Sequence, residues 1–180
     1  NCKIIANGIV LDLIRRAYAF GLNLAKIDIR QESARHFKLI NSVFKKLGMG
    51  EYDKLSEAEK ILFLTKEFKS KRPLIPQNIT LEKDDKETWS TFKMIAESSS
   101  ECLGAYVISM ASNVSDILAV LLLQKEAGIK NYLRIVPLFE TLTDLENSHI
   151  VMENLFKNNW YLKIFKNNQE IMIGYSDSSK

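Results

Sequence analysis

The feature that most constrains the fold is an alternation of short apolar runs with helical segments in the second half of the chain. The runs at residues 105–110, 134–140 and 170–175 are almost continuously apolar, and a helical pattern separates each from the next. Strands that are covered by helices read in this way, and helical crossovers join strands in parallel. We therefore predict a helix-rich α/β fold.

The spacing of these runs favours a barrel. Ser109 and Glu140 are 31 residues apart, and Glu140 and Asp177 are 37 residues apart. Units of this length fit a (β/α)8 TIM-type barrel with some extra helix. An open doubly wound sheet is the alternative, but no glycine-rich phosphate-binding loop follows any predicted strand. We expect residues 1–180 to form a single segment, a partial barrel domain with long helical insertions and about four barrel strands.

The remaining elements follow from apolar periodicity and end signals. One further strand is predicted at Leu22–Ile29, running directly into Arg30. Pro137 lies inside the predicted strand 134–140, where a bulge or the strand end would accommodate it. Capping boxes are predicted at Ser56–Glu59 and Thr143–Glu146, and a cap at Ser115-Asp116. Helices are predicted at 4–20, from Ser33 or Gln31 to Leu47, from Ser56 to before Arg72-Pro73, at 85–97, from Ser115 to Gly128, and from Thr143 through Phe156.

Composition excludes several classes of protein. The net charge is +3 from 25 basic and 22 acidic residues, which is too mild to imply a nucleic-acid or membrane partner. No apolar run reaches 18 residues, so no membrane span is expected. Cys2 and Cys102 lie far apart and form no metal-binding pair. Two reduced thiols in a cytoplasmic protein are the expected state.

Polar residues at the predicted strand ends form a candidate active site. In a barrel the site forms at the carboxyl ends of the strands, which here gives Arg30, Ser109, Glu140 and Asp177, with Lys180 three residues further on. Two carboxylates suit a hard divalent cation such as Mg²⁺. Arginine offers a planar fork of donors for phosphate or carboxylate, and lysine a compact charge.

Each of these residues also has a purely structural interpretation. A lone acid at a strand end is more often a helix cap or a surface residue, and Asp177 fits this description. Arg30 beside Glu32 forms an ordinary ion pair on that view, and Ser109 is interpreted as packing. The two histidines, His36 and His149, are interpreted as structural or surface residues rather than catalysts.

Several stretches occur in an order that is typical of one enzyme family: Ile27-Asp-Ile-Arg-Gln-Glu-Ser33 with Arg35-His36, Ser70-Lys-Arg-Pro-Leu74, Ala105-Tyr-Val-Ile-Ser-Met-Ala111 with Ser115-Asp-Ile-Leu-Ala-Val120, Val136-Pro-Leu-Phe-Glu-Thr-Leu142, and Ile171-Met-Ile-Gly-Tyr-Ser-Asp-Ser-Ser-Lys180. Together they resemble the phosphoenolpyruvate carboxylase family, and the last resembles its second signature. The resemblance covers essentially the whole chain, as a central segment of a much longer protein.

The resemblance implies an enzyme that joins phosphoenolpyruvate to bicarbonate, giving oxaloacetate and phosphate. It implies Mg²⁺ or Mn²⁺ as cofactor, an elaborated (β/α)8 barrel and a cytoplasmic homotetramer. On the family's pattern Glu140 and Asp177 match metal ligands, Arg30 matches an arginine of the phosphate and carboxylate site, and Lys180 matches an active-site lysine.

Two departures from the family pattern limit what this segment does alone. The family's catalytic histidine lies in a Thr-Ala-His-Pro-Thr-Glu motif that this sequence does not contain, and the family's glycine- and arginine-rich loop is also not found. We therefore expect the 180-residue segment to be inactive by itself. The alternatives are another Mg²⁺-dependent barrel enzyme acting on an enolpyruvate-type substrate, or a non-catalytic helical scaffold.

Overall fold

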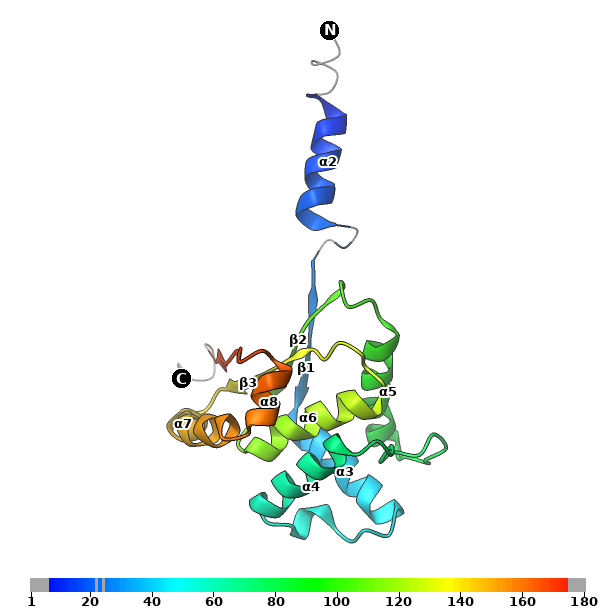
Figure 1. The fold of residues 1–180 in the computed structure, drawn as a ribbon, viewed down its shortest axis with the longest axis vertical. Coiled ribbons are helices and arrows are strands. Elements are labelled where there is room, and N and C mark those ends of the chain that lie inside the picture. The colour runs from blue at the N-terminus through cyan, green and yellow to red at the C-terminus, as the bar shows by residue number, and fades with distance from the viewer. Residues whose placement is uncertain (1–6, 22, 24, 175–180) are drawn as a thin grey trace.

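Four strands and their helical connections make up the body of the molecule (Figure 1). The computed structural model describes residues 7–21, 23 and 25–174. In chain order the elements are α2 (Ile9–Phe20), β1 (Ile27–Glu32), α3 (Ser33–Lys46), the short 3-10 helix Tyr52–Lys54, α4 (Glu57–Lys69), α5 (Lys83–Glu97), β2 (Leu103–Ser109), α6 (Val114–Glu126), β3 (Arg134–Phe139), α7 (Leu142–Phe156), α8 (Asn159–Ile164) and β4 (Met172–Ile173).

The four strands form one parallel sheet in the order β1-β2-β3-β4. β2, β3 and β4 each pair in parallel with the strand that precedes them in the sequence. Parallel neighbours need a crossover connection, and each connection here contains one or more helices. This confirms the predicted helix-rich α/β class with a parallel sheet.

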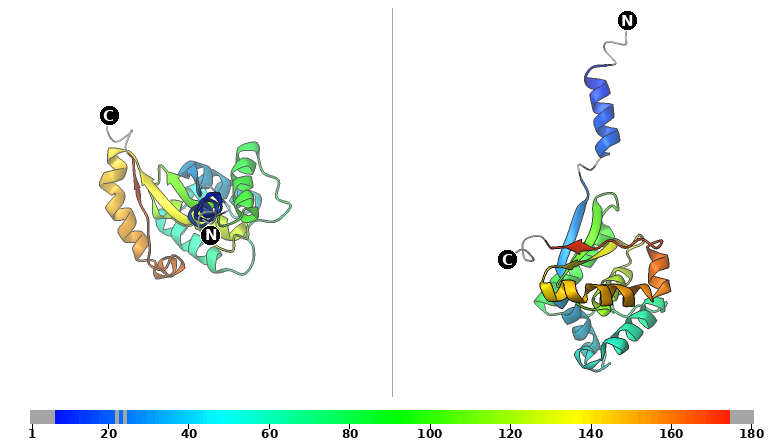
Figure 2. Two further views of the ribbon diagram at one scale, coloured as in Figure 1. Left: turned by 90° about the horizontal axis from the view of Figure 1, so that it is seen from above. Right: turned by 90° about the vertical axis from the view of Figure 1, so that its left-hand side faces the viewer.

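The two faces of the sheet contact different surroundings. One face carries Tyr106, Ile108, Ile135 and Phe139, which belong to the large core that also includes buried residues of α3 to α8. The other face carries a separate buried cluster of Ala105, Val107, Val136 and Leu138. Figures 1 and 2 show helices α3, α4 and α6 gathered on one side of the sheet.

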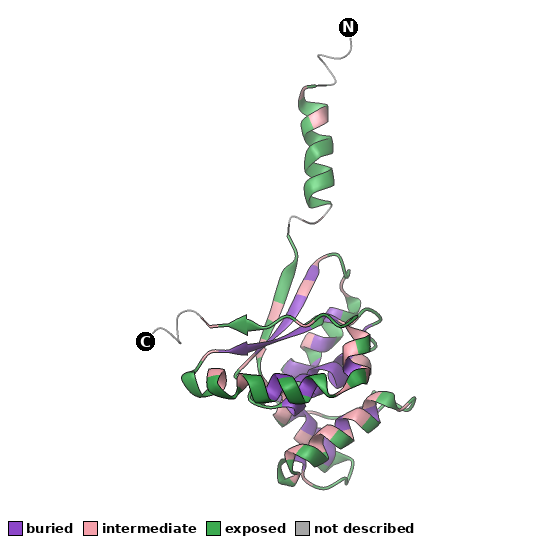
Figure 3. Cartoon of the chain, turned by 60° about the vertical axis from the view of Figure 1, so that its left-hand side comes forward, coloured by how far each residue is buried: buried purple, intermediate pink, exposed green. Residues whose placement is uncertain are grey.

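The central strands are the most deeply buried part of the sheet (Figure 3). In β2 only the second and last residues are partly accessible, and in β3 only the first residue is exposed. Between them α6 carries ten buried residues among its thirteen. This burial explains the apolar runs at residues 105–108, 117–123 and 135–139.

A bulge changes the register where β1 meets β2. Ile27 pairs with Leu103 but Ile29 pairs with Tyr106, so β2 contains one extra residue opposite Asp28. The Asp28 carboxylate accepts a hydrogen bond from the Ala105 backbone N–H at 2.7 Å. Gly104 makes room for it, because a Cβ there would lie 2.2 Å from the Asp28 Oδ1.

Several predicted boundaries differ from those observed. The strand predicted at Leu22–Ile29 is instead β1 at Ile27–Glu32, because its pairing with β2 begins at Ile27; residues 22 and 24 lie outside the described residues. The predicted helix 4–20 begins at Ile9, after the Gly8 N-cap, and residues 4–6 are not described. The helix predicted at 85–97 begins two residues earlier, at Lys83.

The capping predictions were correct at one of three sites. Ser56 and Glu59 form the predicted capping box of α4. The box predicted at Thr143–Glu146 is wrong: Thr141 and Asp144 form it, two residues earlier. The cap of α6 is Asn113, paired with Asp116, rather than Ser115. In both cases the N-cap lies two residues before the predicted one, so the predicted residue lies in the first turn of the helix.

Pro137 needs neither a bulge nor a strand end. Its pairing with Ile108 is in register, and it is the last β3 residue paired with β2. The next two residues, Leu138 and Phe139, pair with β4 instead. The proline therefore lies where β3 changes from one neighbour to the other.

The first helix, α2, lies at one end of the molecule, away from the sheet (Figure 1). None of its described residues is buried, and its apolar residues Ile9, Leu13 and Phe20 are all exposed. In the part of the chain that the structure describes, no helix has the length and apolar character needed to cross a membrane.

Replacing Gly104 with alanine is expected to destabilise the protein by about 1–3 kcal/mol, because the new methyl group displaces the Asp28 carboxylate and leaves the Ala105 N–H without an acceptor. Urea unfolding followed by circular dichroism measures the change. In an Asp28→Ala background the same substitution should cost much less, since the displaced carboxylate is already gone. An equal cost in both backgrounds would contradict this explanation.

Candidate active site at the carboxyl edge of the sheet

Glu140 is an acidic residue at the carboxyl edge of the sheet. It directly follows β3, which ends at Phe139. Its side chain is only 13% exposed. A largely buried carboxylate requires a partner, because burial of an unpaired charge is costly.

Arg30 is that partner, although it comes from β1, two strands away. Its guanidinium forms an ion pair and hydrogen bond with the Glu140 carboxylate. Arg30 is paired with Val107, and Val107 with Val136, so it shares the face of the sheet that carries Val136, Leu138 and Glu140. The Arg30 side chain is 55% exposed and is therefore accessible from solvent.

The position of Arg30 differs from the prediction in one respect. It was expected just beyond the end of a strand but lies inside β1, two residues before its last residue Glu32. The long side chain spans the difference and reaches the edge. The alternative interpretation, an ion pair with Glu32, is not among the contacts of the described residues, where Arg30 pairs with Glu140.

Gly174 packs directly against Glu140 from the neighbouring strand. A Cβ at Gly174 would lie 3.0 Å from both the Cα and the Cγ of Glu140. The Gly174 N–H also donates to the Phe139 carbonyl at 2.9 Å, which continues the pairing of β3 with β4. The glycine thus allows the end of β4 to approach Glu140 closely.

Two of the predicted site residues, Asp177 and Lys180, lie outside the described residues. Among residues 7–21, 23 and 25–174 there is no group of three or more His, Cys, Asp or Glu side chains arranged to hold a metal ion. The described part of the site is therefore one carboxylate and one guanidinium.

The turn after β2 lies beside these groups. Ser109 is the last residue of β2 and is paired with Glu32. Met110 follows with φ of 56°, a left-handed backbone conformation that non-glycine residues rarely adopt and that clusters at functional sites. The Ser33 hydroxyl at the start of α3 donates to the Met110 carbonyl at 2.7 Å. This bond ties the end of β1 to the end of β2.

His36 is a structural residue, as predicted. It is fully buried, and its Nε2 lies 2.7 Å from the Tyr106 hydroxyl. Burial, with the nearby charge of Arg35, lowers the pKa of its imidazole to about 3. His149 is exposed, and its Nδ1 is bonded to the carbonyl of Glu146 on its own helix. Within the described residues, neither imidazole is hydrogen-bonded to Arg30 or Glu140.

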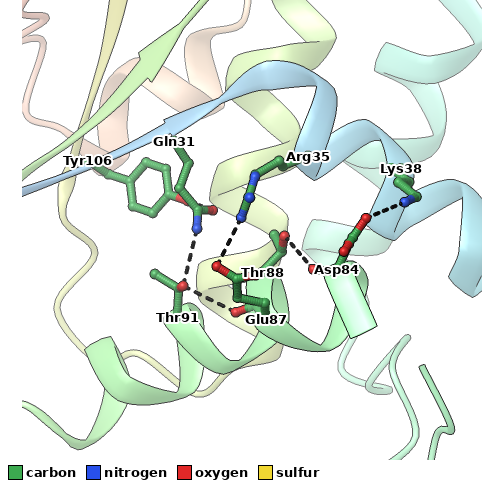
Figure 4. Close-up of polar contacts among 8 residues, drawn as sticks. All are labelled: Gln31, Arg35, Lys38, Asp84, Glu87, Thr88, Thr91 and Tyr106. Atoms are coloured by element: carbon green, nitrogen blue, oxygen red, sulfur yellow. Dashed lines mark hydrogen bonds and ion pairs between the residues drawn. The ribbon is translucent and has the colours of Figure 1, made fainter. Parts of the chain in front are cut away.

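Sequence reasoning missed the polar contacts behind β1, which Figure 4 shows. Gln31 receives a hydrogen bond from Tyr106 and donates one to Thr91 on α5. Arg35 pairs with Glu87 on the same helix. The sequence does contain a signal for these contacts. Adjacent strand residues point to opposite faces, so an Arg30 side chain at the site places the Gln31 side chain on the helix-covered face. A polar side chain buried there needs a hydrogen-bond partner.

These features define a class of protein: a parallel α/β fold with a cationic and an acidic side chain meeting at the carboxyl edge of its sheet. The sequence profile described as phosphoenolpyruvate carboxylase matches residues 1–180. The chain belongs to the phosphoenolpyruvate carboxylase family.

Individual relatives agree with this membership. The phosphoenolpyruvate carboxylase of Aliivibrio salmonicida is 51% identical over 177 residues, which cover 98% of this chain and 20% of the relative. That of Histophilus somni is 48% identical over 178 residues, covering 99% and 20%. That of Acinetobacter baylyi is 48% identical over 187 residues, covering 100% and 21%. The chain thus spans about a fifth of the length of these relatives.

The buried His36 should make the protein less stable in mild acid. Unfolded His36 binds a proton below its ordinary pKa of 6.5, whereas folded His36 does so only near pH 3. Its contribution to stability is therefore complete above pH 6.5 and is lost as the pH falls toward 3. Between pH 7 and pH 5 this loss is about 2 kcal/mol.

The measurement is the free energy of unfolding in urea at pH 7 and pH 5. The free energy of unfolding should decrease between pH 7 and pH 5 by about 2 kcal/mol less in His36→Gln than in the parent protein. In the control, His149→Gln, the decrease should be the same as in the parent. Comparison with variants is needed because burial also raises the pKa of Asp116 to about 6, which acts in the opposite direction. Identical falls in all three proteins would contradict the assignment.

Proposed function

We propose that this chain supplies about half of the barrel, and the metal-binding edge of the active site, of a phosphoenolpyruvate carboxylase. The full-length enzyme would join phosphoenolpyruvate to bicarbonate, giving oxaloacetate and phosphate. The observation that carries the proposal is the meeting of Arg30 with Glu140 at the carboxyl edge, in a chain of this family. A cytoplasmic homotetramer is part of the same proposal.

The topology supports a barrel over an open doubly wound sheet. In a doubly wound sheet the strand order reverses at a switch point, and helices cover both faces. Here the order β1-β2-β3-β4 follows the sequence without reversal. The residues opposite the helix-covered face, Ala105, Val107, Val136 and Leu138, are small or branched apolar residues of the kind that fill a barrel interior.

Glu140 is suited to binding a divalent cation. Its carboxylate offers oxygen ligands, its burial fixes their position, and Mg²⁺ commonly takes only one or two protein carboxylates. The approach of Gly174 brings the end of β4 against it, and Asp177 follows three residues later. Three residues of chain span at most about 11 Å, so Asp177 is within reach of a shared ion.

In the proposed reaction the residues have distinct tasks. Glu140 and Asp177 would hold a divalent cation, which would supply stabilisation of developing negative charge. Arg30 binds the phosphate or carboxylate of the substrate through its fork of donors, and Lys180 contributes a second positive charge. Preorganised groups of this kind are typically worth about 3–4 kcal/mol each to the transition state.

The pairing of Arg30 with Glu140 has a consequence for binding. Glu140 would hold the cation with the carboxylate that pairs with Arg30 in this structure, and Arg30 would then be available to bind an anionic substrate. A non-catalytic scaffold would have no need for a buried carboxylate whose partner is half exposed to solvent, which favours the enzyme over that alternative.

Glu140→Gln in the full-length enzyme should raise the Mg²⁺ concentration needed for half-maximal activity at least about tenfold, because the amide keeps the shape but loses the charge. Asp177→Asn should act in the same direction, with little loss of folded structure. The measurement is carboxylation rate against Mg²⁺ concentration. Glu146→Gln, an exposed acid on α7, is the control. Unchanged metal dependence in Glu140→Gln and Asp177→Asn would refute the metal assignment.

The 180-residue segment alone should not carboxylate phosphoenolpyruvate, because the sequence contains neither the histidine motif nor the glycine- and arginine-rich loop of the family. Oxaloacetate formation by the purified segment is compared with buffer and with the full-length enzyme. Product above the buffer level would overturn this expectation.

A further inference from the structure

We propose that His36, Tyr106 and Gln31 are positioning residues, which act through β1 to aim the Arg30 guanidinium at the active site. This inference rests on the proposed function of Arg30 as an anion-binding residue. It concerns side chains on the opposite face of the sheet, which do not touch the site themselves.

The three residues form a directed chain of hydrogen bonds. The Tyr106 hydroxyl donates to the Gln31 Oε1 at 2.9 Å, so it accepts from the His36 Nε2–H at 2.7 Å. The Gln31 amide nitrogen then donates to the Thr91 hydroxyl at 3.2 Å, which donates to the Glu87 backbone carbonyl. The chain thus connects α3, β2, β1 and α5. Figure 4 shows its Tyr106, Gln31, Thr91 and Glu87 members.

Burial makes this chain rigid. His36 and Tyr106 are both fully buried, and Phe92 packs against both rings, stacked on Tyr106 at 5.2 Å and edge-on to His36 at 6.0 Å. Inside a protein such bonds are stronger than in water, and a broken one leaves a costly unpaired group. Because the His36 pKa is lowered to about 3, the imidazole stays neutral and its role does not change near pH 7.

Side chains as well as backbone pairing tie the carboxyl end of β1 to β2. The Tyr106 hydroxyl of β2 donates to Gln31 of β1. Ser33 adds a second tie at the same place, through its bond to the Met110 carbonyl. The Gln31 and Ser33 side chains therefore hold the carboxyl end of β1 against β2.

Strand geometry couples the orientation of Gln31 to that of Arg30. Gln31 follows Arg30 directly, and neighbouring side chains point to opposite faces. Anchoring Gln31 on the helix side therefore fixes the direction in which Arg30 leaves the backbone on the site side. The guanidinium lies several bonds from that backbone, and its side-chain hydrogen bond within the described residues is to Glu140, so a small backbone rotation moves it appreciably. Misplacement by about 1 Å can cost on the order of a hundredfold in rate.

Tyr106→Phe tests the inference in the full-length enzyme. It removes only the hydroxyl, which takes away two bonds of the chain and keeps the ring packing. The affinity for phosphoenolpyruvate, measured by calorimetry with Mg²⁺ and without bicarbonate, should fall about tenfold. Unchanged affinity in a folded Tyr106→Phe protein would overturn the proposal.

Tyr161→Phe is a matched control. Tyr161 is also fully buried, and its hydroxyl also donates to a glutamine, the Oε1 of Gln169, at 2.8 Å. That glutamine is bonded to the Ile135 carbonyl near the opposite end of the sheet. Both variants should lose stability, but only Tyr106→Phe should lose substrate affinity. An equal loss of affinity in both would indicate a general structural effect and refute the positioning role.

A double-mutant cycle separates positioning from general destabilisation. If Tyr106 acts through Arg30, then Tyr106→Phe should change the affinity for phosphoenolpyruvate less than about twofold in an Arg30→Gln background, because the guanidinium that Tyr106 positions is already absent. A tenfold loss in both backgrounds would mean that Tyr106 acts by another route, and the inference would be wrong.

A third readout does not depend on the reaction. Without substrate, phenylglyoxal modification of Arg30, followed by peptide mass spectrometry, should be at least about threefold faster in Tyr106→Phe than in the parent or in Tyr161→Phe, because a misdirected guanidinium leaves Glu140. A parent enzyme that neither binds nor carboxylates phosphoenolpyruvate would refute the proposed function. In that case an unchanged modification rate would also refute positioning, whereas a raised rate would support it.

Discussion

The parallel pairing of β2 with its two neighbours is the constraint on which the rest of the structure depends. β2 is hydrogen-bonded to β1 on one side and to β3 on the other. It also separates the two apolar clusters, because Tyr106 and Ile108 face the helices while Ala105 and Val107 face the other way. The distance between Arg30 and Glu140 is fixed by this strand, since each is attached to one of its neighbours.

The type and order of most elements were predictable because local sequence and tertiary burial agree. Residues 115–126 are helical and almost wholly buried, and residues 103–109 and 134–139 form buried strands, so their apolar runs carry the signal. Prediction was weaker at β1, where exposed polar residues alternate with apolar ones and only pairing with β2 decides where the strand begins. The short helix α8 was not predicted, and β4 is shorter than its apolar run indicated.

The candidate site was predictable in part, and the reason lies in how it is assembled. Glu140 follows a strongly apolar strand, so its place at the edge can be inferred from the sequence. The partner of Glu140 cannot, because 110 residues separate it from Arg30 and the contact depends on strand order. The same holds for Gln31 with Tyr106, which lie 75 residues apart. Side chains that meet across strands leave no local pattern, although an isolated polar residue in a buried strand indicates that a partner exists.

The bulge opposite Asp28 has a consequence for how this strand tolerates changes in length. Leu103 and Tyr106 are three residues apart, yet both belong to the helix-side core, because the extra residue between them reverses the alternation of side chains. Deleting one residue there would leave Leu103 and Tyr106 two residues apart in a regular strand, so both would still face the helices. Deleting one residue beyond the bulge, by contrast, would exchange the two faces of the rest of β2. The bulge is therefore the point in β2 at which the loss of one residue preserves both apolar clusters.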